Sequence, residues 1–254
     1  MREIILAANW KMYKTISEGL ELVECLKQKI HGYPKVIICP SFTALSNIKK
    51  VISNNELELG AQNLFYEKQG AFTGEISPLM LKDAGVKYVI IGHSERRHIL
   101  GETNELINRK MMAAIENGII PIFCVGEKIE ERKSGQTENI IKKQILEGLK
   151  NIDKDSLDKV IIAYEPVWAI GTGLNAEPEE ASKVHQFIRN TLNEIYSDKT
   201  GENITILYGG SIKEDNIEGL GKMEEIDGGL VGGASLNCNT FSSIWNKLKT
   251  IKNI

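Results

Sequence analysis

The sequence lacks both an excess of basic residues and any long apolar run. Its 254 residues include 31 Lys and Arg against 34 Asp and Glu, for a net charge of -3, and the pI is about 5.9. No basic face is therefore expected, and nucleic acid is not an expected partner. The apolar stretch near the amino terminus covers only residues 4–8, too short for a signal core or a membrane span. These features predict a cytoplasmic protein with no membrane partner.

Cysteine is scarce and scattered, and no Cys-x-x-Cys pair occurs. This spacing signals neither a disulfide framework nor a zinc site, so reduced structural thiols are expected. His93 and His98 lack the i, i+4 spacing typical of a helical metal site, and no metal is expected. The four cysteines are Cys25, Cys39, Cys124 and Cys238.

No linker rich in proline, glycine or serine divides the chain. Eight short runs of branched apolar residues alternate instead with stretches of helical periodicity. The runs are continuously apolar, which favours a parallel sheet buried on both faces. We therefore expect a single (β/α)8 TIM barrel domain over residues 1–254, with a doubly wound open sheet as the alternative. The eight runs are residues 3–9, 35–39, 57–62, 88–92, 119–125, 160–165, 204–208 and 227–232.

Several helices carry recognisable ends. Thr15 and Glu18 fit a capping box, Thr103 is a predicted N-cap, and Pro178 opens a helix with an acidic first turn. Two of these stretches have an apolar face. His31 and His185 are expected on surface helices or loops. The apolar faces comprise Ile107, Met111, Ala114 and Ile115 in one stretch, and Phe241, Ile244, Trp245 and Leu248 in the other.

The segment 161–173 carries the strongest chemical signal. An apolar run ends at Glu165, and Pro166 cannot donate to a strand ladder, so pairing is expected to stop at Glu165. Apolar residues and then Gly171 and Gly173 follow. Taken alone, the segment fits either a catalytic base beside a lid that excludes water, or a buried glutamate followed by an ordinary loop.

Polar residues recur where other predicted strands end. Asn9 and Lys11 follow the first, and His93 and Glu95 follow the fourth. Glycine-rich turns follow the seventh and eighth, where barrels commonly bind phosphate through backbone N–H groups. Each feature also has a plain explanation: Lys11 as a surface lysine, His93 as a core histidine, and the glycines as a tight turn. The barrel brings all of them to one rim, and this convergence favours a site.

The segments that contain these strand-end residues resemble the triosephosphate isomerase family, in the same order and over nearly the whole chain. The resemblance implies a cofactor-free homodimer that interconverts dihydroxyacetone phosphate and D-glyceraldehyde 3-phosphate in glycolysis and gluconeogenesis. It also matches the long loop 65–77, with Thr73, to the family's inter-subunit loop. The matching segments are ANWKM (8–12), IGHSERR (91–97), AYEPVWAIGTG (163–173), YGGS (208–211) and GGASL (232–236).

The resemblance also implies a role for each site residue. Glu165 is the base that moves the proton, and His93 donates to the enediolate oxygens as a neutral ring, kept uncharged by the helix that follows it. Lys11 supplies positive potential, with Glu95 beside it. The residues implied in substrate binding are Asn9 and Lys11, and, at the phosphate under a closing loop 166–173, Gly171, Ser211, Gly232 and Gly233.

The match is weakest just after the lid. The family usually has Lys-Thr there, whereas this chain has Leu174 and Asn175, which places the hinge rather than the chemistry in question. Residues 171–176 also fit a loose dinucleotide fingerprint, Gly-x-Gly-x-x-Ala, but they do not follow the first strand. A dehydrogenase and a non-catalytic phosphate-binding barrel are therefore the alternative functions. Glu165, His93 and Lys11 are all present, which argues against the second.

Overall fold

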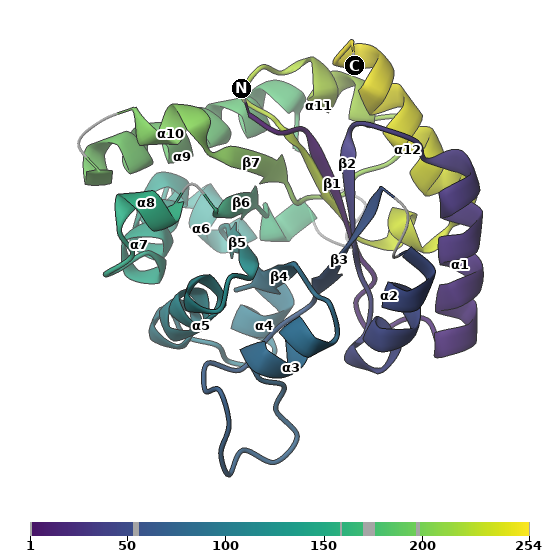
Figure 1. The fold of residues 1–254 in the computed structure, drawn as a ribbon. Helices are drawn as coiled ribbons and strands as arrows, with labels where there is room; N and C mark the ends of the chain where they lie inside the picture. The colour runs from purple at the N-terminus through teal and green to yellow at the C-terminus, as the bar shows by residue number, and fades with distance from the viewer. Residues whose placement is uncertain (1, 53–55, 158, 170–175, 197–198, 254) are drawn as a thin grey trace.

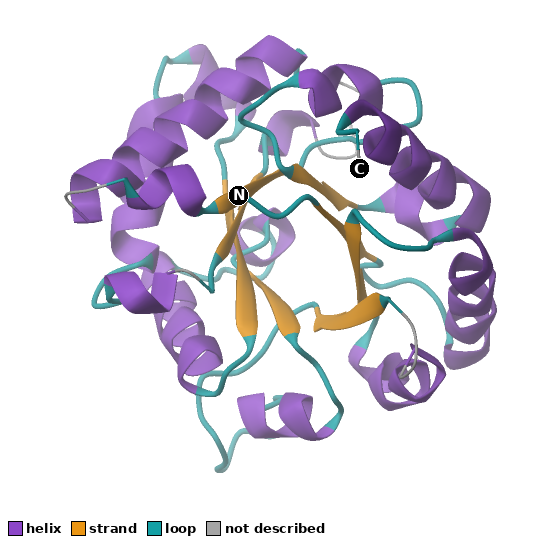
Figure 2. Ribbon diagram, turned by 45° about the horizontal axis from the view of Figure 1, so that its top comes forward, coloured by secondary structure: helices purple, strands orange, loops and turns teal. Residues whose placement is uncertain are grey.

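Eight parallel strands close into one barrel in chain order, with helices around it (Figures 1 and 2). The computed structural model describes residues 2–52, 56–157, 159–169, 176–196 and 199–253. The first strand pairs with both the second and the eighth, which confirms the (β/α)8 barrel over the open sheet. The strands are β1 (Ile5–Asn9), β2 (Lys35–Cys39), β3 (Leu57–Ala61), β4 (Tyr88–Ile91), β5 (Ile120–Val125), β6 (Ile161–Tyr164), β7 (Thr205–Tyr208) and β8 (Gly228–Val231).

The helices form the outer ring around these strands (Figure 2). Among the described residues, none of them is long and apolar enough to cross a membrane. The α-helices are α1 (Ile16–Lys29), α2 (Leu45–Ile52), α3 (Pro78–Asp83), α4 (Ser94–His98), α5 (Asn104–Glu116), α6 (Ile129–Lys133), α7 (Thr137–Gly148), α8 (Lys154–Leu157), α9 (Pro178–Tyr196), α10 (Thr200–Asn203), α11 (Ile217–Lys222) and α12 (Cys238–Ile251). Three short 3₁₀ helices are η1 (Phe42–Ala44), η2 (Val167–Ala169) and η3 (Gly233–Leu236).

Every strand lies inside the range predicted for it. The predicted ranges are too long by at most two residues at an end, because ladder pairing stops before the apolar character of the chain does. The end of β6 is the clearest case. The Glu165 N–H donates to the Val125 carbonyl at 2.8 Å, and Pro166 then has no N–H to continue the ladder.

Alternation along the strands separates an inner from an outer core. In β1, Ile5 and Ala7 pack inside the barrel, whereas Leu6 and Ala8 pack outward among the helices. Successive side chains of a strand point to opposite faces. The same alternation directs Glu165 inward, since it follows the inner residues Ile161 and Ala163 of β6.

The predicted helix ends are confirmed. Thr15 and Glu18 form the capping box of α1, the Thr103 side chain caps α5, and Pro178 is the first residue of α9. The two predicted apolar faces are largely buried, with Ile115 partly so. Local sequence therefore determines where these helices begin and which side faces the strands.

The prediction that all four cysteines are reduced is wrong. Cys25 of α1 and Cys238 of α12 form a disulfide across 213 residues of sequence, while Cys39 and Cys124 are free and buried. Closure of the barrel explains the pairing, because it brings the first and last helices side by side (Figure 1). Spacing along the sequence gives no sign of this neighbourhood.

The prediction of a surface position for His185 is also wrong. Its side chain is fully buried, with Nδ1 3.2 Å from the Glu225 carbonyl and an edge-on contact with the Tyr164 ring. His185 lies on the inward face of α9, beside the buried Ala181, Ile188 and Leu192. His31 is exposed, as predicted.

Candidate active site

A cavity of about 370 Å³ opens at the carboxyl ends of the strands. Barrels of this architecture place their active sites at that end. The structure brings seven of the nine predicted site residues to its wall: Asn9, Lys11, His93, Glu165, Ser211, Gly232 and Gly233. Glu95 stands just outside it, against Lys11. Gly171 lies outside the described residues.

Glu165 is buried, with only 2% of its surface exposed. The Ser94 N–H donates to its Oε2 at 2.9 Å. Its Oε1 lies 2.9 Å from His93 Nε2, yet it has no well-directed hydrogen bond among the described residues. Burial acts to raise the pKa of this carboxyl, but His93, the Ser94 N–H and Lys11 together hold the pKa below its ordinary value. The carboxylate is thus charged, and one oxygen remains available for a proton.

His93 is placed by a sharp turn after β4. Gly92 has φ +75°, a conformation that favours glycine, and a Cβ there would meet the Cys124 carbonyl at 3.2 Å. His93 is then the N-cap of α4, and the Glu95 N–H donates to its Nδ1. A ring that accepts at Nδ1 carries its proton on Nε2, which is the nitrogen that faces Glu165.

Two influences act on the charge of His93. Burial lowers its pKa, while the Glu165 carboxylate beside it raises the pKa, and the net shift is upward from the ordinary value. The accepted Glu95 N–H opposes protonation at Nδ1. A substrate oxygen that accepts from His93 Nε2 in place of Glu165 would weaken the contact that raises the pKa of His93. The neutral catalytic ring therefore stays a prediction.

Lys11 is held in an unusual backbone conformation. Its φ is +51°, which is uncommon outside glycine and marks local strain. The Asn9 side chain accepts from its N–H at 3.0 Å, and Gln62 donates to its carbonyl at 2.8 Å. Its Nζ lies 2.6 Å from Glu95 Oε1. Three neighbours thus fix the position of one cation at the cavity wall.

The part of the cavity wall beside Lys11 is suited to an anion, since a Cβ on Gly232 would lie 3.9 Å from Lys11 Nζ. Gly232 and Gly233 open the 3₁₀ helix η3, whose first N–H groups have no carbonyl partner within that helix. Ser235 secures this turn, because its hydroxyl and N–H both donate to the Gly232 carbonyl. Ser211 lies in the turn after β7 and also lines the cavity. Exposed N–H groups at such a turn bind phosphate well.

The segment after Glu165 begins with a buried anchor. Trp168 donates from its indole nitrogen to Glu127 Oε1 at 3.0 Å, and Tyr164 donates to the same oxygen at 3.2 Å. Arg132 stacks over the Trp168 ring at 4.5 Å. Burial raises the pKa of Glu127 despite these donors. The rest of the predicted lid, with Leu174 and Asn175, lies at residues 170–175, outside the described part of the chain.

Four residues of this region escaped the sequence prediction. Gln62 is the last residue of the predicted strand 57–62, and Lys213 lies two residues after the predicted turn 208–211. A polar residue at either position was a usable signal. Glu127 comes two residues after β5, which is the same kind of signal. Gly209 lies in the glycine-rich turn predicted after the seventh strand, but its role of leaving room beside the base was not predicted: a Cβ there would lie 2.8 Å from Glu165 Cγ.

Together these groups can carry out proton transfer next to a carbonyl. A buried carboxylate, an imidazole that donates from Nε2, a fixed ammonium and a set of backbone donors line one cavity. Such an arrangement can remove a proton, stabilise the resulting oxyanion and hold a phosphate. The groups named are all side chains or backbone of this chain.

Comparison with known proteins agrees with this geometry. The family model described as triosephosphate isomerase matches residues 4–248. The chain is 50% identical over 252 residues to the triosephosphate isomerase of Dictyoglomus thermophilum, covering 98% of this chain and 100% of that protein. It is 47% identical over 247 residues to that of Clostridium tetani, covering 97% of each. The Carboxydothermus hydrogenoformans protein of the same name is 49% identical over 248 residues, covering 96% of this chain and 98% of its own.

Proposed function

The chain belongs to the triosephosphate isomerase family, and from this we propose that it interconverts D-glyceraldehyde 3-phosphate and dihydroxyacetone phosphate. The reaction is a reversible aldose–ketose isomerisation in glycolysis and gluconeogenesis. It proceeds through an enediolate. No cofactor takes part in the proposed chemistry.

Glu165 is the proposed base. Its carboxylate takes the proton from the carbon beside the substrate carbonyl, and the electrons of that C–H bond move toward the carbonyl oxygen to give the enediolate. Glu165 then returns the proton to the former carbonyl carbon, while the hydroxyl proton on the other carbon passes to the former carbonyl oxygen, so that the second oxygen becomes the new carbonyl. The support is its lowered pKa, which keeps the carboxylate charged, and Oε1, which has no directed hydrogen bond among the described residues.

His93, Lys11 and Asn9 are the proposed stabilisers of the enediolate. His93 donates from Nε2 to the developing oxyanions, and Lys11 adds a positive charge on the same side. The side-chain oxygen of Asn9 accepts from the Lys11 N–H. The side-chain N–H₂ of Asn9 is therefore the group that would donate to a substrate oxygen. Glu95 is a positioning residue in this proposal, because its contact is with the Lys11 ammonium.

The phosphate is proposed to bind at Ser211, Gly232 and Gly233, with Gly171 from the lid. Lys213 also lines the cavity and would add a second cation beside the phosphate.

The convergence of Glu165, His93 and Lys11 on one cavity that the Gly232–Gly233 turn also lines carries this proposal. The test is a coupled assay of purified protein treated with EDTA, with no added nucleotide. We expect isomerisation of glyceraldehyde 3-phosphate, and Glu165→Gln should lower kcat by about 10³- to 10⁴-fold because an amide cannot accept the proton. Phosphate affinity of that variant should be retained. Loss of activity with EDTA, or a fully active Gln variant, would contradict the proposal.

The dehydrogenase alternative has little support. Its loose fingerprint begins only after β6 and η2, whereas a true fingerprint follows the first strand directly. NADH fluorescence that stays unchanged on adding protein would dispose of it. A protein that binds inorganic phosphate but does not isomerise the triose phosphate would instead be the non-catalytic barrel.

We also propose a symmetric homodimer through loop 65–77. Large apolar side chains are exposed in the segments after the first four strands, among them Met12 at 96% after β1 and Met80 at 55% after β3. Loop 65–77 projects from the barrel beside α3 (Figure 1). Thr73 would approach Lys11 and His93 of the other protomer, so each site would need its neighbour. A fully active monomer in light scattering at assay concentration would overturn this proposal.

A cytoplasmic location is proposed on the family's place in glycolysis. Fractionation of the native cells, with activity measured in each fraction, is the direct test. Activity recovered mainly with membranes would contradict it.

A further inference from the structure

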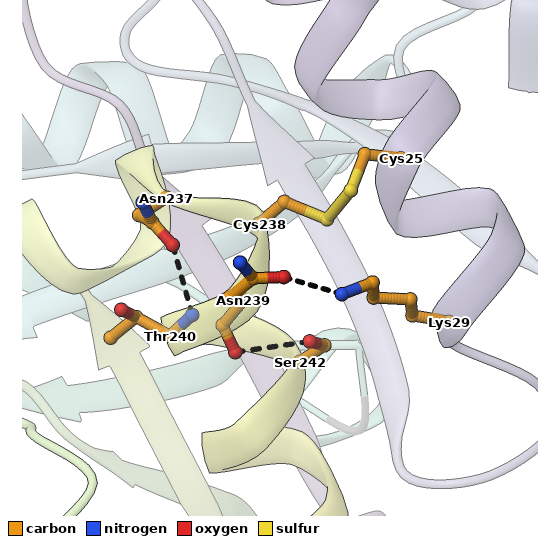
Figure 3. The surroundings of a disulfide bond; sticks show 7 residues. All are labelled: Cys25, Lys29, Asn237, Cys238, Asn239, Thr240 and Ser242. Atoms are coloured by element: carbon orange, nitrogen blue, oxygen red, sulfur yellow. Dashed lines mark hydrogen bonds between the residues drawn. A yellow bond between two sulfur atoms is a disulfide. The ribbon is translucent and has the colours of Figure 1, made fainter.

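The Cys25–Cys238 disulfide lies at the one place where the ring of strand–helix units is not continuous in sequence. Consecutive units are joined by the polypeptide itself, whereas the last unit meets the first only through contacts. These contacts are the β1–β8 ladder and links such as the Trp245 indole N–H to the Pro34 carbonyl, at 2.8 Å. The disulfide adds a covalent bond across this seam (Figure 3).

The two cysteines of the seam are less buried, as residues, than the other two cysteines of the chain. Cys25 and Cys238 are partly exposed at the surface, while Cys39 and Cys124 are fully buried inside the barrel. Burial raises the pKa of both inner thiols far above the ordinary value. Thiol–disulfide exchange needs access and a thiolate, so a reagent can reach the outer pair but not the inner one.

The local charges also favour opening of this bond in one direction. Cys238 is the first residue of α12, a 14-residue helix whose amino end stabilises a thiolate. Lys29, one turn after Cys25, donates to Asn239 next to Cys238 and brings a positive charge to the same place (Figure 3). Cys238 is therefore the better leaving group when an incoming thiolate attacks the Cys25 sulfur.

We propose that Cys25 and Cys238 form a redox-modification site at which a dithiol reductant opens the seam and lowers the resistance of the barrel to unfolding. The dithiol attacks the Cys25 sulfur, the Cys25–Cys238 bond breaks, and Cys238 leaves as a thiolate that takes up a proton. The second thiol of the reagent then displaces Cys25. The products are two protein thiols and one cyclic disulfide of the reagent, with two electrons and two protons passed to the protein.

Opening the bond should leave the catalytic centre in place. The β1–β8 ladder and the hydrogen bonds of Asn9, Lys11 and η3 do not depend on the disulfide. The main effect is on the unfolded chain, which gains the freedom of a loop that spans 213 residues. Static disulfides are rare in a reducing compartment. There, opening and closing of this bond would change the stability of the fold and not the rate of turnover. That last step rests on the proposed cytoplasmic location.

The test uses the purified full-length chain with dithiothreitol and its oxidised form as probes. After oxidation, alkylation of the denatured protein should label two thiols, and after native reduction, alkylation of the folded protein should label only Cys25 and Cys238. Reduction should lower Tm by roughly 10 °C and change kcat/KM by less than twofold. Cys25→Ser should have the Tm of the reduced protein and no response to the reductant. Cys238→Ser should behave in the same way.

Three results would overturn the proposal. The first is four labelled thiols in the oxidised, denatured chain, which would mean that the bond does not form. The second is native labelling of Cys39 or Cys124, which would mean that access does not discriminate between the pairs. The third is an unchanged Tm on reduction. This comparison uses the unmodified chain alone, so it remains valid if either serine variant fails to fold.

Discussion

Charged side chains are buried at both ends of the barrel, but they differ in how completely they are hydrogen-bonded. At the amino end, Arg189 donates to Asp227 and Glu225 and to the carbonyls of Gly201 and Ile204. Asp227 in turn accepts from Arg2 and from the Ile206 N–H. At the carboxyl end, Glu165 keeps an oxygen without a directed partner among the described residues.

The difference separates groups that hold the fold from groups that react. A buried ion pair with all its hydrogen bonds made has no capacity left for a substrate, and it resists being broken. A buried carboxylate on the wall of a cavity, with one oxygen next to a donor that a substrate can displace, is held ready to accept a proton. The same residue types thus serve structure at one rim and chemistry at the other.

Removal of Asp227 at the amino end should lower the free energy of unfolding more than a substitution at the carboxyl end. Asp227→Ala leaves the Arg189 guanidinium, 5% exposed, without its buried partner, and we expect the free energy of unfolding to fall by about 3–5 kcal/mol. The kcat of the folded fraction should stay within about twofold. Urea unfolding and steady-state kinetics measure the two quantities.

Glu225→Gln is the matched control for Asp227→Ala. Glu225 contacts the same arginine, but its side chain is 24% exposed, so we expect a loss of only about 1 kcal/mol. A large drop in kcat for Asp227→Ala, with stability little changed, would contradict the division of labour between the rims.

Gly209→Ala should disturb the carboxyl end alone. The added Cβ would lie 2.8 Å from Glu165 Cγ, so either the base or the strand end must move. A displacement of about 1 Å commonly costs roughly 100-fold in rate, or about 2.7 kcal/mol. We expect that loss in kcat, with a small change in KM.

Gly233→Ala adds the same methyl group to the same rim, where it meets no protein atom within 4 Å, and since Gly233 is a proposed phosphate ligand, its main cost is expected in KM. Its backbone N–H is retained, and we expect an effect of about twofold on kcat. Equal losses of kcat in Gly209→Ala and Gly233→Ala would show that space beside Glu165 is not the reason for glycine at position 209.

The sequence predicts what depends on local pattern. The strand ranges, the caps at Thr15 and Thr103 and the proline at the start of α9 follow from hydrogen-bonding and periodicity rules that act over a few residues. The rim residues follow one step later, because parallel strands in a closed barrel end on the same side. That step suffices for Asn9, His93 and Glu165.

Features that depend on distant neighbours could not be predicted in this way. Cys25 and Cys238 meet only because the barrel closes, and no spacing rule reaches across 213 residues. His185 occupies an inward position of α9 beside Tyr164, whereas its residue type alone favours a surface. The role of Gly209 is to leave space, which a sequence does not express.

The two buried histidines give the finest test of the comparison. His93 faces a carboxylate, and its pKa is raised. Burial, with Arg189 nearby, lowers the pKa of His185 to about 3. His185 is neutral in both the folded and unfolded chain above about pH 6.5, so it has no pH-dependent effect on stability there. As the pH falls below about 6.5, the unfolded chain takes up the proton and the folded one does not, and stability decreases.

The expected decrease from His185 is about 2 kcal/mol at pH 5, from roughly 1.5 pH units at 1.36 kcal/mol each. His185→Gln should lose this contribution, so the difference in unfolding free energy between wild type and variant should narrow by that amount between pH 7.5 and 5. His93 has the opposite sign, since its raised pKa stabilises the fold below about pH 6.5 and the contribution is lost as the pH rises through its folded pKa. A constant difference between wild type and His185→Gln across this range would mean that the folded protein admits the proton. His185 would then be hydrated or mobile rather than locked between α9 and the barrel, and burial alone would not explain why one histidine is charged more readily than the other.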